Sequence, residues 1–198
     1  MTSAIFEKAI TNKVPLNAQA HCVALFEESP FHFKISRNRK SKSGDYIYDK
    51  RKDLSVVTVN SGLNPYSFLI TLVHETAHHT TRLKHNRFVL PHGSEWKIEF
   101  RNLMLPLVNP LVFPDDLIRL LAKHLKNPKA STWSDSHLSM ALRKYDTRNT
   151  DISEQHLDEI KDGMDFKFND RLFTKLEKRR TRVLCQECST GRKYLIPN

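Results

Sequence analysis

The segment from Val73 to His78 places two histidines four residues apart, with a glutamate directly after the first of them. It lies inside a longer pattern in which apolar residues recur every three or four positions, namely Tyr66, Leu69, Ile70, Val73 and Ala77. Such a stripe is typical of a buried amphipathic helix, and Asn64-Pro65 supplies a helix start. The sequence therefore predicts a helix from Pro65 onward that carries both histidines in its interior.

His74 and His78 have the spacing that two ligands of one metal ion need on a helix. Residues four apart lie on the same face, so both rings can present a nitrogen to one Zn²⁺ ion. Glu75 lies beside them, where this H-E-x-x-H motif uses the glutamate as a general base. The motif therefore predicts a zinc-dependent hydrolase, with a pair of ordinary surface histidines as the alternative.

A third protein ligand is required, because a catalytic zinc ion takes three side chains and keeps its fourth position for water or substrate. We choose His92, which stands where a second helix would begin. The segment from Thr80 to Leu90 is long enough to turn the chain back toward the first helix. Glu95 is an alternative, because some enzymes with this motif take a carboxylate as their third ligand.

Other nearby side chains fit the ligand role less well. His79 points about 100 degrees away from His78 around the helix, and His85 lies at or beyond the helix end. Glu99 fits an ordinary charge on a helix face. The positions after His78 lack the Gly and His at fixed short spacing that define metzincins, so that branch of zinc proteases is excluded.

The rest of the pattern predicts further helices and short strands. Helices are expected over residues 2–10, 16–28, 95–107, 114–126 and 134–143. From Phe166 onward apolar and charged residues alternate, with a turn at 189–191, which predicts one or two small basic hairpins.

The H-E-x-x-H helix, the following His92-Gly93 pair and the aromatic residue Trp96 resemble the SprT-like metalloprotease domain, which bacterial SprT and eukaryotic Spartan proteins share. Segments 31–35, 42–46 and 54–60 resemble the family's short sheet with its Gly-containing turn. The run 59–63 leads into the helix in the family's manner. The resemblance covers residues 15 to 110 well and the tail less well.

This resemblance implies an α+β fold in which a zincin-like metalloprotease domain packs its helices on a small three-stranded sheet, followed by a C-terminal basic β-hairpin region. It also implies that His74, His78 and His92 bind one catalytic Zn²⁺ ion and that Glu75 is the catalytic acid/base. The expected divisions are a metalloprotease domain over 1–145, an acidic linker or helix over 146–165, and a basic β-hairpin tail over 166–198.

The chain is basic, with Lys and Arg exceeding Asp and Glu by +10 and an isoelectric point near 9.6. Its cations gather between Lys34 and Lys52 and again in the tail, with an acidic stretch over 146–165 between them. Clustered cations give salt-sensitive, sequence-independent binding to nucleic acid, although a solvated basic surface is the alternative. With the family resemblance, the candidate DNA contacts are Arg37, Arg39, Lys40, Lys42, Lys178, Arg179, Arg180 and Arg182.

Cys185 and Cys188 form a C-x-x-C pair in the tail, where many SprT-like proteins carry a zinc ribbon. A structural zinc ion needs four ligands, and no further Cys or His follows Cys188. We therefore expect a degenerate ribbon, a metal-free hairpin that keeps the strand scaffold. The alternative is a shared metal site, in which other residues or a second molecule supply the missing ligands.

Three cysteines, unevenly placed, do not make a secreted disulfide framework. Charges at Glu7, Lys8 and Lys13 interrupt any signal-peptide core, and the longest apolar run, Phe68–Val73, is too short to cross a bilayer. We therefore expect a soluble, intracellular protein in the cytoplasm, with nucleoid association or a nuclear location left open, and no membrane partner.

The motif and the resemblance together predict a zinc-dependent endopeptidase that associates with DNA and cleaves proteins trapped on it. One alternative is a nonenzymatic DNA-binding or scaffold protein with a structural zinc ion. The other is a zinc peptidase that acts on peptides without DNA.

Overall fold

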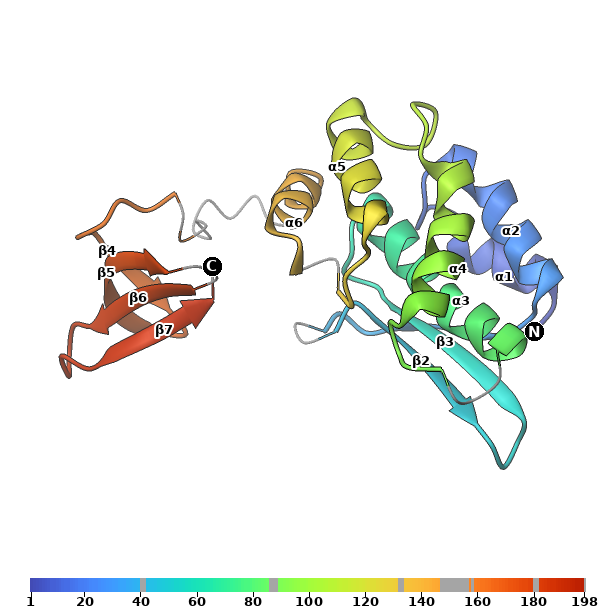
Figure 1. Cartoon of the computed structure of the whole chain (residues 1–198), viewed down its shortest axis with the longest axis horizontal. Helices are drawn as coiled ribbons and strands as arrows, with labels where there is room; N and C mark the ends of the chain where they lie inside the picture. Colours follow the sequence, from blue (N-terminus) through green and yellow to red (C-terminus); the bar gives the residue numbers. More distant parts are fainter. Residues whose placement is uncertain are drawn as a thin grey trace. The chain divides into compact units, whose positions relative to one another are not determined.

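The computed structural model describes residues 1–39, 42–85, 89–131, 134–146, 157, 159–179 and 182–197. The chain divides into two compact units, 1–147 and 148–198, each with its own core. The described residues form six α-helices, a three-stranded mixed sheet and a four-stranded antiparallel sheet, which confirms the α+β class (Figure 1). The predicted boundaries at 145 and 165 stay predictions, since most of the acidic stretch lies outside the described residues.

The sheet of the first unit consists of β1 (His32–Ser36), β2 (Gly44–Asp49) and β3 (Leu54–Asn60) in the order β1-β3-β2. β1 runs parallel to β3 and β2 runs antiparallel to it, so β2 is an edge strand. The sheet therefore has the three strands that the resemblance implied. Gly44 opens β2 and does not belong to a turn, which corrects that detail of the expectation.

The central helix α3 (Pro65–His85) packs on β2 and β3 and buries most of its residues. The side-chain oxygen of Asn64 accepts a hydrogen bond from the backbone N–H of Ser67, which satisfies a free donor at the helix start. Thr71, Thr76 and Thr80 are buried, and each hydroxyl donates to the carbonyl four residues earlier. The predicted start at Pro65 is confirmed, and His85 is the last residue of the helix.

The remaining helices of the first unit complete the core around α3 (Figure 1). They are α1 (Ser3–Ile10), α2 (Gln19–Glu28) after the 3-10 turn η1 (Leu16–Ala18), α4 (Ser94–Met104) with the turn η3 (Leu105–Leu107), α5 (Asp115–Lys126) and α6 (Ser136–Arg143). α4 packs along α3, and α5 packs against α6. Among the described residues, no helix is long and apolar enough to cross a membrane.

The second unit is one antiparallel sheet of β4 (Asp165–Phe168), β5 (Arg171–Arg179), β6 (Arg182–Glu187) and β7 (Lys193–Pro197). Its small core contains Leu157, Phe173, Val183, Cys185 and Ile196. The sequence pattern predicted one or two hairpins in this region, but it did not mark β5 as one of their strands. A β-bulge between Lys175 and Glu177 breaks the alternation of that strand, which hides its period of two.

Candidate metal centre

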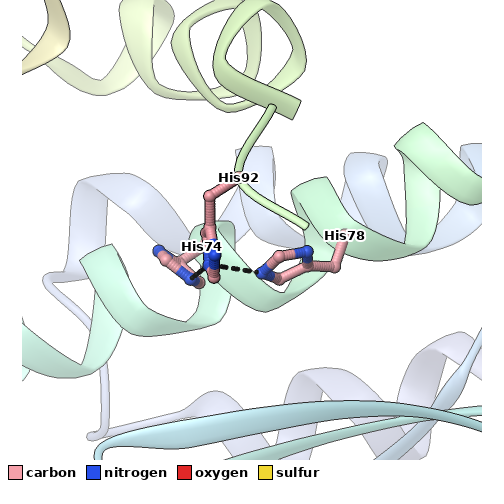
Figure 2. Close-up of side chains that lie close together, drawn as sticks. All are labelled: His74, His78 and His92. Atoms are coloured by element: carbon pink, nitrogen blue, oxygen red, sulfur yellow. Dashed lines mark hydrogen bonds between the residues drawn. The ribbon is translucent and has the colours of Figure 1, made fainter. Parts of the chain in front are cut away.

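His74, His78 and His92, here called the histidine triad, come together on one side of α3 (Figure 2). His74 and His78 lie one turn apart on the helix, and His92 reaches them from the loop before α4. The Nε2 atom of His92 lies 3.2 Å from Nε2 of His74 and 3.0 Å from Nε2 of His78. Among the described residues, no other group of His, Cys, Asp or Glu converges in this way.

The spacing of the triad fits a zinc ion. With Zn–N bonds of about 2.0–2.1 Å and tetrahedral angles, two ligand nitrogens lie about 3.3 Å apart, close to both short distances here. Protons alone cannot pair these nitrogens well, because Nε2 of His92 faces two other Nε2 atoms and can donate only one hydrogen. The donor set therefore suits a metal ion with nitrogen ligands.

The backbone of His92 adopts a left-handed conformation, with φ of 60°. A residue with a side chain visits this region at a cost of order 1–3 kcal/mol, so other contacts must hold it there. The neighbouring turn is closed by a hydrogen bond from the Gly93 N–H to the Leu90 carbonyl. This local fold turns His92 back toward α3, which sequence spacing by itself could not show.

Trp96 forms the wall behind the triad. Its side chain is buried, and its ring lies 4.6 Å from that of His74, 5.2 Å from that of His78 and 4.6 Å from that of His92. Phe100, one turn further along α4, stacks on Trp96 at 5.1 Å. This packing restricts the three imidazoles to few orientations, so the first turns of α4 organise the site.

The histidines of the triad are neutral near pH 7. Burial, followed by the neighbouring histidines, lowers the pKa of His74 to about 2 and that of His78 to about 4. Burial also lowers the pKa of His92. A neutral imidazole keeps the lone pair that a metal ion requires, so no proton has to leave these rings before metal binding at neutral pH.

Glu75 lies on α3 next to the triad and is buried against β2. A Cβ atom at position 44 would lie 2.6 Å from Cγ2 of Thr71 and 3.0 Å from Cγ of Glu75, so the glycine at that position makes room for both side chains. The pKa of Glu75 is raised to about 8, mainly by burial and also by Asp45, whereas Lys42 and Arg39 act to lower it. The carboxyl group of Glu75, the residue that follows His74, thus lies in a low-dielectric environment.

Tyr46 contributes to the site from β2, although the sequence did not single it out. Its ring is nearly parallel to that of His78, at 6.2 Å, and also contacts the ring of His79. Its hydroxyl pairs with Ser55 Oγ on β3 at 3.0 Å. No sequence signal marks this role, because it depends on where β2 crosses α3.

The side chains that the sequence ranked below His92 have other partners. Glu99 is buried and pairs with Lys84 at 2.9 Å, whereas Glu95 accepts a hydrogen bond from Ser94. His79 is buried against Phe31 and Tyr46, away from the triad.

The first basic cluster lies close to Glu75. The side chain of Asn60 donates to the carbonyls of Arg39 and Lys42 and accepts from the N–H of Arg39, which anchors this loop to the end of β3. Arg39 pairs with Asp45 at 3.1 Å, so its charge is partly committed, whereas Arg37 and Lys42 are exposed. Lys40 lies outside the described residues.

The second basic cluster lies on β5 and β6. Lys178, Arg179 and Arg182 are exposed, and Arg179 pairs with Glu177 at 2.8 Å. Arg180 lies outside the described residues. The contacts of both basic clusters with DNA stay predictions.

The two cysteines of the tail do not face one another as knuckle ligands would. Cys185 is fully buried in the core of the second unit, and its thiol points to the Val183 carbonyl. Cys188 is exposed and lies 3.4 Å from Thr174 Oγ1. Neither belongs to a metal-ligand group among the described residues, and the metal-free ribbon stays a prediction.

Comparison of the chain with protein-family models, with curated proteins and with solved structures gave no match.

Proposed function

We propose that the chain is a zinc-dependent endopeptidase of the SprT-like type. One observation carries the proposal: three Nε2 atoms converge at α3, where His74 is followed directly by the buried residue Glu75. The triad is partly exposed, which leaves room for a substrate at the fourth position of a metal ion. A purely structural zinc site would use a fourth protein ligand, and the described residues supply three.

In the proposed reaction the triad holds the metal ion and Glu75 moves the proton. Zn²⁺ supplies Lewis-acid chemistry, polarising a carbonyl and making water more acidic. The positive charge of the bound metal ion would favour the ionised form of Glu75. The carboxylate would then accept the proton of the attacking water and pass it to the leaving amine, for which it must lie within reach of both. Trp96 keeps the imidazoles in place and excludes solvent from one side of the site.

The edge strand β2 offers a place for the peptide. Its inner side pairs with β3, and Gly44 at its start touches Glu75. A sheet edge presents backbone donors and acceptors to which an extended peptide can add. A peptide bound there would lie alongside the site of proton transfer.

We also propose that the substrate is protein held on DNA. The loop with Arg37, Arg39 and Lys42 is anchored by Asn60 next to β2 and Glu75, so nucleic acid bound to this loop would keep an attached protein near the metal centre. Such binding is sequence-independent and weakens with salt.

The test is a cleavage assay on a protein crosslinked to single-stranded DNA, with the zinc-loaded protein. Cleavage that requires Glu75 and increases when the target is attached to DNA is the expected result. Cleavage of free and attached targets at equal rates would favour a DNA-independent peptidase. No cleavage of either target, with intact zinc and DNA binding, would favour a scaffold protein.

A further inference from the structure

A pocket of the first unit lies at the C-terminal end of α3. It has a volume of about 760 Å³ and is bounded by the end of α3, the loop before β1 and the turn between β2 and β3. His79, Arg82 and Tyr48 are among its lining residues. No step of the proposed reaction uses this pocket.

The pocket continues the metal centre along α3 and β2. Three contacts between the two elements follow each other: Gly44 touches Glu75, Tyr46 stacks on His78, and the guanidinium of Arg82 lies over the ring of Tyr48. His74, His78 and Arg82 are four residues apart, so they share one face of α3. Along β2, Tyr46 therefore lies between Gly44, which is next to Glu75, and Tyr48, which lines the pocket.

Arg82 is held in a fixed position but its charge has no acidic partner among the described residues. Its guanidinium carbon lies 3.3 Å from the centre of the Tyr48 ring, a cation–π contact that leaves the edge donors of the group free. Two other charged residues of the pocket, by contrast, already have polar partners. Lys84 pairs with Glu99, and Asp53 accepts a hydrogen bond from the Tyr48 hydroxyl.

Glu28 also lines the pocket, but it is exposed to solvent and makes no ion pair among the residues that the structure describes. Phe31 and Leu54 add apolar surface beside these polar groups. A ligand with a short aliphatic stem and a terminal carboxylate matches both kinds of surface, because a guanidinium binds a carboxylate through two parallel hydrogen bonds.

We propose that this pocket binds an acidic side chain of the peptide substrate and that Arg82 determines this specificity. The proposal rests on the proposed peptidase function. Arg82 lies four residues beyond His78, about 6 Å along the helix. An extended peptide advances about 3.3 Å per residue, so the acidic residue lies about two residues from the peptide bond at the metal centre, on one side of it.

The test uses matched peptides that carry Glu, Gln or Lys at each of the three positions on either side of the cleaved bond. For the wild-type protein, kcat/KM is expected to be about tenfold higher with Glu than with Gln at one position, as a charged hydrogen bond allows. Arg82→Gln should bring this ratio to about one, and Arg82→Glu should favour Lys. Arg119→Gln, which changes an exposed arginine of α5, is the matched control and should keep the wild-type ratio.

A binding arm keeps the proposal testable without cleavage. Calorimetry with the Glu75→Gln protein, loaded with zinc, measures the affinity of the Glu and Gln peptides directly. Equal affinities, or a preference for Glu that survives Arg82→Gln, would overturn the proposal. It would also be overturned if Arg82→Gln weakened binding of a single-stranded oligonucleotide and not of the Glu peptide, since the anion would then be a phosphate. Failure of cleavage for every peptide would count against the peptidase and leave the binding result to decide on the pocket.

Discussion

Two buried glutamates, one in each unit, have opposite electrostatic environments. Glu75 in the first unit is 7% exposed, and Glu187 in the second is 4% exposed. Burial raises the pKa of Glu75 to about 8, whereas hydrogen bonds from Arg171 and Thr190 lower the pKa of Glu187 to about 2. The two pKa shifts have opposite signs because burial is the main cause for Glu75, whereas hydrogen bonds from Arg171 and Thr190 are the main causes for Glu187.

The same contrast holds for other buried polar groups. In the second unit Lys175 is buried, but its ammonium group donates to the Ile160 carbonyl and pairs with Asp162 at 3.1 Å. In the first unit the triad nitrogens have only one another as partners among the described residues. Paired charges stabilise a small sheet, whereas groups without such partners are free to bind a metal ion or move a proton.

The largest expected difference between the two glutamates is in catalysis. Glu75→Gln removes the proton acceptor without changing the shape of the side chain, so peptide cleavage should fall about 10³-fold, as for loss of a general base. Zinc content, measured by atomic absorption, should stay at one ion per chain. Glu187→Gln is the matched substitution, and it should keep the rate of cleavage. A cleavage rate for Glu75→Gln equal to that of Glu187→Gln would contradict the role assigned to Glu75.

The next effect concerns metal affinity. His92→Ala removes one of three ligands, and zinc affinity in a chelator competition should fall by about 100-fold or more. His85→Ala changes an exposed histidine at the end of α3 and serves as the control, with an affinity like that of the wild type. If both variants bound zinc equally well, His92 would not be a ligand.

The sequence could predict α3 and the ligand pair His74 and His78, because both follow from the repeat of the α-helix. The apolar stripe and the spacing of His74 and His78 express the same 3.6-residue repeat, so a local pattern is enough. The need for a third ligand and the family resemblance indicate His92 as a ligand. Its left-handed backbone, which aims it at α3, carries no local signature.

Features that depend on how distant segments cross could not be predicted. The contact of Tyr46 with His78 and that of Arg82 with Tyr48 arise because β2 runs beside α3. Lys175 illustrates the converse. It belongs to a run of cations that pattern analysis places on a surface, but the register of β5 turns it into the interior of the second unit.

The free energy of unfolding of the metal-free protein should depend on pH through Glu75. The folded-state pKa of Glu75 is about 8, above its usual value of 4.5, so the folded state holds a proton that the unfolded state has released in this interval. The contribution of Glu75 to stability should therefore fall as pH rises from 4.5 to 8, by up to about 1.4 kcal/mol per pH unit. Above pH 6.5 the histidines of the triad do not oppose this slope, since they are then neutral in both states. Urea unfolding of the metal-free protein at several pH values measures this slope.

Glu75→Gln has no proton to lose and should flatten that slope. The triad acts with the opposite sign at lower pH, because the pKa values of His74 and His78 are lowered to about 2 and about 4. Their contribution is present above the unfolded value of 6.5 and is lost as pH falls toward 4. A wild-type slope between pH 7 and 8 that persists unchanged in Glu75→Gln would assign the effect to another group.

The smallest expected effect is a loss of stability of the second unit at low pH. This change of stability with pH has the sign opposite to that caused by Glu75. Because the pKa of Glu187 is lowered to about 2, its contribution to stability is complete above 4.5 and is lost as pH falls toward 2. Amide hydrogen exchange in β5 and β6 should speed up over this interval in the wild type, and less so in Glu187→Gln. The change should be modest, because the Arg171 side chain is 47% exposed and solvent screens the pair. Glu75→Gln should leave exchange in these strands unchanged, since Glu75 belongs to the core of the other unit. If the faster exchange at low pH were lost in Glu75→Gln and kept in Glu187→Gln, the roles assigned to the two glutamates would be wrong.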